Sequence, residues 1–131
     1  MGIGVVHTSL NNRQVIHQCR ELLHQGKIRF EFAVKWVPVD YWCWTDLDSI
    51  SQLIDENIVP RIEPNETWAM RVNKRRWQKY HTLEIVTTLA AHIDRRVNLS
   101  QPDKIVWIDI LGNDTAVSIL KPDEIFSAVL E

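Results

Sequence analysis

The residues best suited to chemistry with a ligand lie in one basic segment, residues 71–81. Its first nine residues contain five bases and no acid, and aromatic residues lie among them. Lysine and arginine neutralise phosphates and aromatic faces stack on unpaired bases, so this mixture is typical of RNA-binding segments. The candidate RNA-binding residues are Arg71, Lys74, Arg75, Arg76, Trp77, Lys79 and His81.

A second interpretation of the basic segment involves no ligand. A charge cluster in a loop is most often a solvated surface, and Trp77 and Tyr80 are equally suited to anchoring the loop to the core. Composition alone leaves both interpretations open. The rest of the chain is acidic, because the net charge is −2 and residues 40–66 contain seven acids and one base. A basic patch on an acidic protein favours a directed electrostatic contact.

Other reactive residue types form no recognisable catalytic or metal-binding pattern. The five histidines contain no HxxxH pair, and the glycine motifs of nucleotide-binding loops are absent from the sequence. Cys19 lies in the apolar stripe of a predicted helix, where a thiol usually serves packing. The carboxylate pairs Asp46 with Asp48 and Asp55 with Glu56 are interpreted as a solvated helix surface. We therefore expect no catalysis, no cofactor and no metal site.

Two tryptophans support an alternative function. Trp42 and Trp44 flank Cys43 just before a predicted helix, where they could form an exposed aromatic patch or close the core. Together with the acidic residues 40–66, an exposed patch would make the chain a protein-interaction module. Charge reversal at Arg75 and Arg76 distinguishes this alternative from RNA binding.

Length and composition limit the classes to which the protein can belong. With 131 residues and 45% hydrophobic residues, the chain can bury a core without disulfides. Its two cysteines are too few for a disulfide framework, its N-terminus does not resemble a signal peptide, and no apolar run is long enough for a membrane helix. We expect a soluble cytoplasmic domain that does not contact membranes.

Apolar periodicity predicts the order β-α-β-α-β-α-β-β-α. The first half reads as a strand at 3–7, a helix ending before Gly26, an alternating strand at 28–39 and a helix begun by a capping pattern at 45–48. The predicted elements of the second half are a strand from Trp68 into the basic segment, a helix from Thr82 to Val97, a central strand at 105–111, a hairpin turning at 112–114 and a short helix near Pro122.

Residues 58–127 resemble a THUMP domain. They contain a strand with a basic segment (WAMRVNKRRWQKYHT), a helix (LEIVTTLAAHIDRR), the turn VNLSQPD and a closing hairpin (KIVWIDILGNDTAVSIL). The resemblance implies an α/β (α+β) fold with a mixed sheet. The predicted organisation is a THUMP-like RNA-binding domain at 58–131, preceded by a β-α-β-α region at 1–57.

The resemblance also implies a function. THUMP domains bind tRNA, commonly at the acceptor stem and its single-stranded 3′ end, and guide tRNA-modifying enzymes to it. The chain is similar to stand-alone THUMP adaptors such as the one that assists a tRNA cytidine acetyltransferase. We therefore expect a non-catalytic adaptor whose partners are tRNA and a modifying enzyme. The acidity of the chain departs from the family's basic character and argues against strong autonomous affinity.

Overall fold

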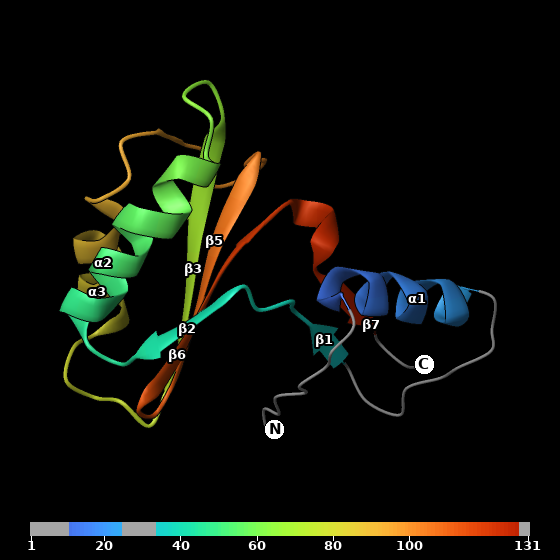
Figure 1. Cartoon of the computed structure of the whole chain (residues 1–131), viewed down its shortest axis with the longest axis horizontal. Coiled ribbons are helices and arrows are strands. Elements are labelled where there is room, and N and C mark those ends of the chain that lie inside the picture. Colours follow the sequence, from blue (N-terminus) through green and yellow to red (C-terminus); the bar gives the residue numbers. More distant parts are fainter. Residues whose placement is uncertain (1–10, 25–33, 129–131) are drawn as a thin grey trace. The chain divides into compact units, whose positions relative to one another are not determined.

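The computed structural model describes residues 11–24 and 34–128 and divides the chain into two compact units (Figure 1). One unit comprises Met1–Pro38 with Glu124–Glu131, and the other comprises Val39–Asp123. This division differs from the predicted ranges 1–57 and 58–131, because residues 39–57 belong to the same unit as the segment that follows them.

The first unit contains the helix α1 (Asn12–His24), which confirms the predicted helix. The Asn11 side chain caps it by accepting hydrogen bonds from the backbone N–H groups of Arg13 and Gln14, at 3.0 and 3.1 Å. Strand β1 (Val34–Trp36) pairs antiparallel with β7 (Phe126–Ala128), a strand that was not predicted. The predicted strand at 3–7, Gly26 and most of the strand at 28–39 lie outside the described residues.

The second unit is built on a mixed five-stranded sheet, which confirms the predicted fold class. Its strand order is β2-β6-β5-β3-β4, in which β3 runs parallel to β5 and β4 and the other pairs are antiparallel. The strands are β2 (Tyr41–Trp44), β3 (Thr67–Arg75), β4 (Arg96–Val97), β5 (Lys104–Leu111) and β6 (Asp114–Leu120). The apolar strand β5 is central, as its composition predicts.

The predicted hairpin and turn are both present. Gly112 joins β5 to β6 with a φ of +67°, which favours glycine. In the preceding turn, the Asn98 side chain accepts hydrogen bonds from the backbone N–H groups of Ser100 and Gln101 at 3.1 and 3.0 Å. These two turns fix the register of β5 against its neighbours.

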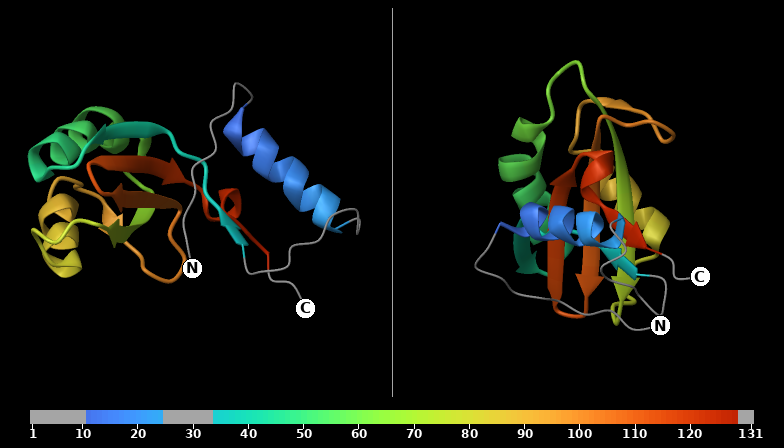
Figure 2. Two further views of the ribbon diagram at one scale, coloured as in Figure 1. Left: turned by 90° about the horizontal axis from the view of Figure 1, so that it is seen from below. Right: turned by 90° about the vertical axis from the view of Figure 1, so that its right-hand side faces the viewer.

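A layer of helices covers one face of the sheet (Figures 1 and 2). It consists of α2 (Leu47–Leu53), the π-helical turn η1 (Ile54–Ile58), the 3-10 turn η2 (Val59–Arg61) and α3 (Thr82–Ala90). A further 3-10 turn, η3 (Pro122–Glu124), stands where the short helix near Pro122 was predicted. No helix in the described part of the chain is long and apolar enough to cross a membrane.

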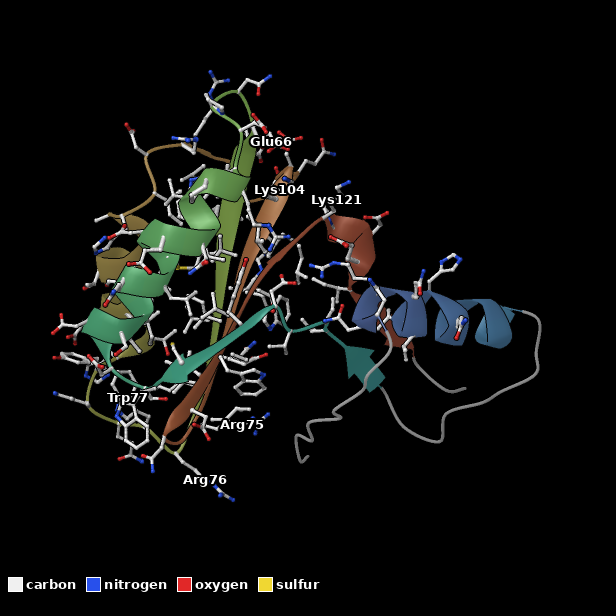
Figure 3. The ribbon with its side chains drawn as sticks, in the orientation of Figure 1. Glu66, Arg75, Arg76, Trp77, Lys104 and Lys121 are labelled. Atoms are coloured by element: carbon white, nitrogen blue, oxygen red, sulfur yellow. The ribbon has the colours of Figure 1, made fainter. Side chains whose placement is uncertain are left out.

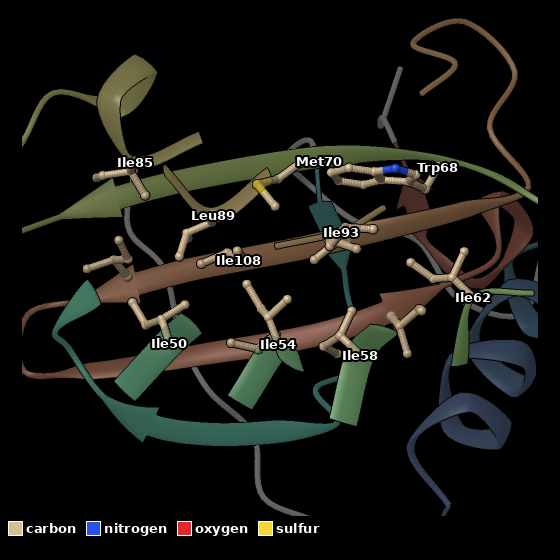
Figure 4. Packing of buried hydrophobic residues seen from close by; sticks show 14 residues of the cluster. Ile50, Ile54, Ile58, Ile62, Trp68, Met70, Ile85, Leu89, Ile93 and Ile108 are labelled. Carbon is tan, nitrogen blue, oxygen red and sulfur yellow. The ribbon is translucent and has the colours of Figure 1, made fainter. Parts of the chain in front are cut away.

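The widened turn η1 follows from the spacing of the core isoleucines. Ile50, Ile54, Ile58 and Ile62 are four residues apart and almost completely buried (Figure 4). In an α-helix with about 3.6 residues per turn, each step of four rotates the side chain by about 40° beyond a full turn. A π-helical turn rotates less per residue and keeps the isoleucines facing the sheet. Opposite them lie Trp68, Met70 and Ile108.

Helix α3 is shorter than predicted. The sequence predicts a helix to Val97, but α3 ends at Ala90, and Val97 is 54% exposed in the edge strand β4. Backbone bonds from His92 to Leu89 and from Ile93 to Ala90, at 3.1 and 3.0 Å, tighten the chain past the helix end. The chain then joins the edge of β3, so pairing with the sheet overrides the helical periodicity.

Candidate nucleic-acid interface

Strand β3 distributes the basic segment between two faces of the sheet. Val72 and Lys74 point toward the helices, so alternation places Arg71, Asn73 and Arg75 on the face opposite α2 and α3. All three side chains on that face are exposed. The basic segment is therefore not a single cluster, although Arg71 and Arg75 share one face.

Lys74 is tied to the protein itself. Its Nζ donates a hydrogen bond of 2.7 Å to the backbone carbonyl of Tyr80 and is partly buried. This contact fastens the loop that follows β3 to the strand before it. The structure therefore gives Lys74 a positioning role within the predicted RNA-binding set.

The two arginines at the end of β3 project from the tip of the sheet. The N–H of Gly112 donates a 2.8 Å hydrogen bond to the carbonyl of Arg75, which places this strand end beside the β5–β6 turn. Arg76 has a φ of 60°, an uncommon value for a residue other than glycine, and there the chain leaves the sheet. Both side chains are exposed (Figure 3).

Trp77 and Tyr80 anchor the loop while keeping part of their surface accessible. Their rings meet edge to face, with centroids 5.7 Å apart and planes inclined by 64°, and both pack against the core. The Nζ of Lys79 lies 5.6 Å from the centre of the Tyr80 ring. The second interpretation of the sequence is therefore correct for Trp77 and Tyr80, which anchor the loop to the core, and RNA binding by this loop stays a prediction.

His81 stands at the N-cap of α3, one residue before the predicted Thr82. It is exposed, and its side chain makes no capping hydrogen bond to the helix. The first backbone N–H groups of α3 thus lack a side-chain acceptor, an arrangement that suits an anion. His81 and Lys79 belong to the same turn of chain.

The exposed cations of this region differ from two other cations of the second unit, Arg61 and Lys104. Among the described residues, Arg71, Arg75, Arg76 and Lys79 make no ion pair. In contrast, Arg61 pairs with Asp40 at 3.7 Å, and Lys104 pairs with Glu66 at 3.2 Å. Cations without an ion-pair partner are available to phosphates. Of the four, only Lys79 lies near a carboxylate, because its charge helps to lower the pKa of Asp46.

The acidic region contains an edge strand that the sequence did not predict. Strand β2 turns Tyr41 and Cys43 toward the core and leaves Trp42 and Trp44 exposed, at 43% and 61%. Burial, reinforced by the nearby carboxylate of Asp46, raises the pKa of Cys43, so its thiol is a poor nucleophile. Of the two interpretations of the tryptophans, the structure favours the exposed patch.

The strongest catalytic pattern in the second unit is an exposed histidine and carboxylate. The Nδ1 of His92 lies 3.0 Å from Asp55, but no described hydroxyl lies within hydrogen-bond distance of the ring. Within residues 11–24 and 34–128, no three candidate ligands gather as a metal site would require. This pair alone does not form a nucleophile activated by a base.

The sequence of the second unit matches a known family. Residues 45–120 match the THUMP domain. The chain belongs to the THUMP domain family. The match begins 13 residues before the predicted resemblance at 58–127 and therefore includes α2. Family membership supports a role in binding tRNA.

A curated relative extends the similarity to the first unit. An uncharacterized protein of Methanocaldococcus jannaschii is 36% identical over 122 residues, which cover 90% of this chain and 31% of that protein. The chain thus spans about a third of the length of this relative.

Two solved structures resemble this one in fold. TrmN from Thermus thermophilus aligns with a TM-score of 0.60 and 9% identity, over 87% of this chain and 33% of TrmN. PH1313 from Pyrococcus horikoshii aligns with a TM-score of 0.52 and 13% identity, over 67% of this chain and 33% of its own. At such low identity these similarities show the fold alone.

Proposed function

We propose that this chain binds tRNA at its acceptor stem and single-stranded 3′ end and presents it to a tRNA-modifying enzyme. The observation that carries the proposal is the set of exposed cations without ion pairs at the end of β3 and in the following loop. These cations are Arg71, Arg75, Arg76 and Lys79. Family membership supports the same ligand.

In this proposal the chain supplies no catalytic group, and the reaction belongs to the enzyme that receives the tRNA. The resemblance to stand-alone adaptors favours a cytidine acetyltransferase acting in the cytoplasm. The enzyme is either a separate protein or a further part of a longer polypeptide, and the length of the M. jannaschii relative is compatible with both arrangements. The role of the chain is the same in each.

The proposal is tested by measuring the affinity of the purified chain for tRNA and for acceptor-stem mimics with and without the 3′ tail. Four phosphate contacts predict that the logarithm of affinity falls with the logarithm of salt with a slope of about −3 to −4. We expect tail-dependent binding with such a slope. Equal affinity for both mimics, or binding that salt does not weaken, would contradict the proposal.

A specific observation favours a second candidate function, docking of a partner protein on the acidic region. Trp42 and Trp44 are exposed on an edge strand that directly precedes the acidic helix α2. Exposed tryptophans are enriched at protein interfaces. The two functions are compatible, because the exposed arginines of β3 and the acidic region lie on different elements.

A further inference from the structure

A groove lies between α2 with η1 on one side and α3 on the other. Its volume is about 790 Å³, which is within the range of built ligand sites. Asp48, Ser51 and Asp55 line one wall, and Thr88 and His92 line the other. The turn between β2 and α2 and the loop after β3 also contribute to its lining.

The groove is negatively charged. Four carboxylates line it, those of Asp46, Asp48, Asp55 and Glu56. The basic side chains that accompany them are Lys79 and His92. His92 is already engaged by Asp55. The hydroxyl of Ser49, followed by backbone N–H groups, holds the pKa of Asp46 below its ordinary value, so this carboxylate is charged at neutral pH. Asp48 and Glu56 make no ion pair among the described residues.

Aromatic side chains complete the lining of the groove. Trp44, which is 61% exposed, lies on its border together with Trp77 and Tyr80. Guanidinium groups stack on such rings more readily than ammonium groups do. A groove that combines carboxylates with exposed indole rings therefore favours arginine.

The wall that carries Asp55 and Glu56 is the π-helical turn η1. Such widened turns are rare and occur frequently at functional sites. Here the turn keeps Ile54 and Ile58 in the core while it presents two adjacent carboxylates to solvent.

We propose that this groove receives an arginine-containing basic segment of the tRNA-modifying enzyme. Its charge is complementary to such a segment and repels the phosphates of tRNA. The proposal rests on the adaptor function for the identity of the partner. Binding of a basic peptide, however, can be measured without RNA. The adaptor would then hold RNA through its exposed arginines and its enzyme through its carboxylates.

The probe is a fluorescein-labelled peptide of twelve residues that contains four arginines and two leucines. Fluorescence anisotropy measures its affinity for the full chain, and lysine and glutamine versions of the peptide measure the contribution of the guanidinium groups. We expect the arginine peptide to bind more tightly than the lysine peptide, and the glutamine peptide to bind at least about tenfold more weakly.

Matched variants test the location of peptide binding. The isosteric changes Asp48→Asn and Glu56→Gln together should weaken peptide binding about fivefold or more. The control changes Glu63→Gln and Asp94→Asn alter the net charge equally at exposed acids outside the groove and should have little effect. Equal weakening by both pairs, or no binding of the arginine peptide at low salt, would overturn the proposal.

A parallel titration with the acceptor-stem mimic separates this proposal from the RNA-binding function. The double variant Asp48→Asn with Glu56→Gln should bind the mimic with unchanged affinity. The double variant Arg75→Gln with Arg76→Gln should bind the mimic more weakly and the peptide with unchanged affinity. If the mimic does not bind at all while the peptide binds in the groove, RNA binding fails and the groove assignment remains. A loss of affinity for the mimic in the variant Asp48→Asn with Glu56→Gln would overturn the assignment of the groove to the peptide.

Discussion

The two ends of strand β3 both carry charged side chains but use them differently (Figure 3). At its beginning, Asp103 accepts a hydrogen bond of 2.8 Å from the N–H of Thr67, and Lys104 pairs with Glu66 at 3.2 Å. At its end, Arg75 and Arg76 are exposed and have no ion-pair partner among the described residues. The first group of charges connects the sheet to its turns, whereas the second is left for a ligand.

The largest expected effect concerns the unpaired end. Arg75→Gln with Arg76→Gln removes two phosphate contacts, so affinity for tRNA near 0.1 M salt should fall by about 10- to 100-fold. The melting temperature should not change, because neither side chain holds the fold together.

The matched control, Arg61→Gln with Lys104→Gln, removes two paired cations. It should lower the melting temperature while changing the affinity less than about twofold. If the Arg61 and Lys104 variant lost tRNA affinity and the Arg75 and Arg76 variant lost only stability, the proposed difference between the two ends of β3 would be wrong.

Lys74 gives a second test, because it lies near the exposed arginines but donates a hydrogen bond to the Tyr80 carbonyl. Lys74→Met removes the hydrogen bond to the Tyr80 carbonyl and should lower the free energy of unfolding by about 1–2 kcal/mol, as measured by denaturant titration. The salt slope of tRNA binding, measured well below the melting temperature, should remain that of the wild type. A slope reduced by about one would instead make Lys74 a phosphate contact.

At the paired end, Asp103 tests whether the charges are structural. Asp103→Ala leaves the N–H of Thr67 without its side-chain acceptor and should cost about 1 kcal/mol of stability. Asp103→Asn keeps an acceptor oxygen and should cost less. We expect both variants to bind tRNA as the wild type does, and a loss of binding in a stable Asp103→Asn protein would argue against this view.

The smallest expected effect is the pH dependence contributed by Glu66. The N–H of Glu63, with help from Lys104, holds the pKa of Glu66 below its ordinary value of 4.5. A lowered pKa in the folded state means that the stabilisation is present above pH 4.5 and is lost as pH falls through the lower value. Glu66→Gln should therefore flatten the decline of the melting temperature below pH 4.5, and an unchanged acid profile would contradict this assignment.

Much of the second unit could be predicted from sequence because its patterns are local. The alternation of β3, the apolar run of β5 and the turn residues around Gly112 each predict an element that the structure contains. The end of α3 could not be predicted, since the apolar pattern continues to Val97 and only pairing with β3 interrupts it. Strand β2 was missed because its four residues are shorter than a recognisable alternation.

The candidate interface was predictable in composition but not in geometry. The sequence identifies the basic residues, yet it does not reveal that Lys74 bonds to Tyr80 or that Arg71 and Arg75 share the face opposite α2 and α3. The groove was missed for a related reason. Its carboxylates were interpreted as solvated helix surface, and only the packing of α2 beside α3 brings them to Tyr80, Thr88 and His92. The spacing of the core isoleucines was the one sequence feature that pointed to the widened turn.

The most direct test of the comparison is an NMR titration of the wild-type chain with the acceptor-stem mimic carrying its 3′ tail. The arginine side-chain Nε–H signals and the backbone amide signals report each position separately. We predict that the signals of Arg71, Arg75 and Arg76 and the amides of residues 75–82 shift, while those of Arg61 and Arg95 do not. Shifts confined to Arg61 and Arg95, with none at residues 75–82, would contradict the assignment of the unpaired end of β3 to RNA.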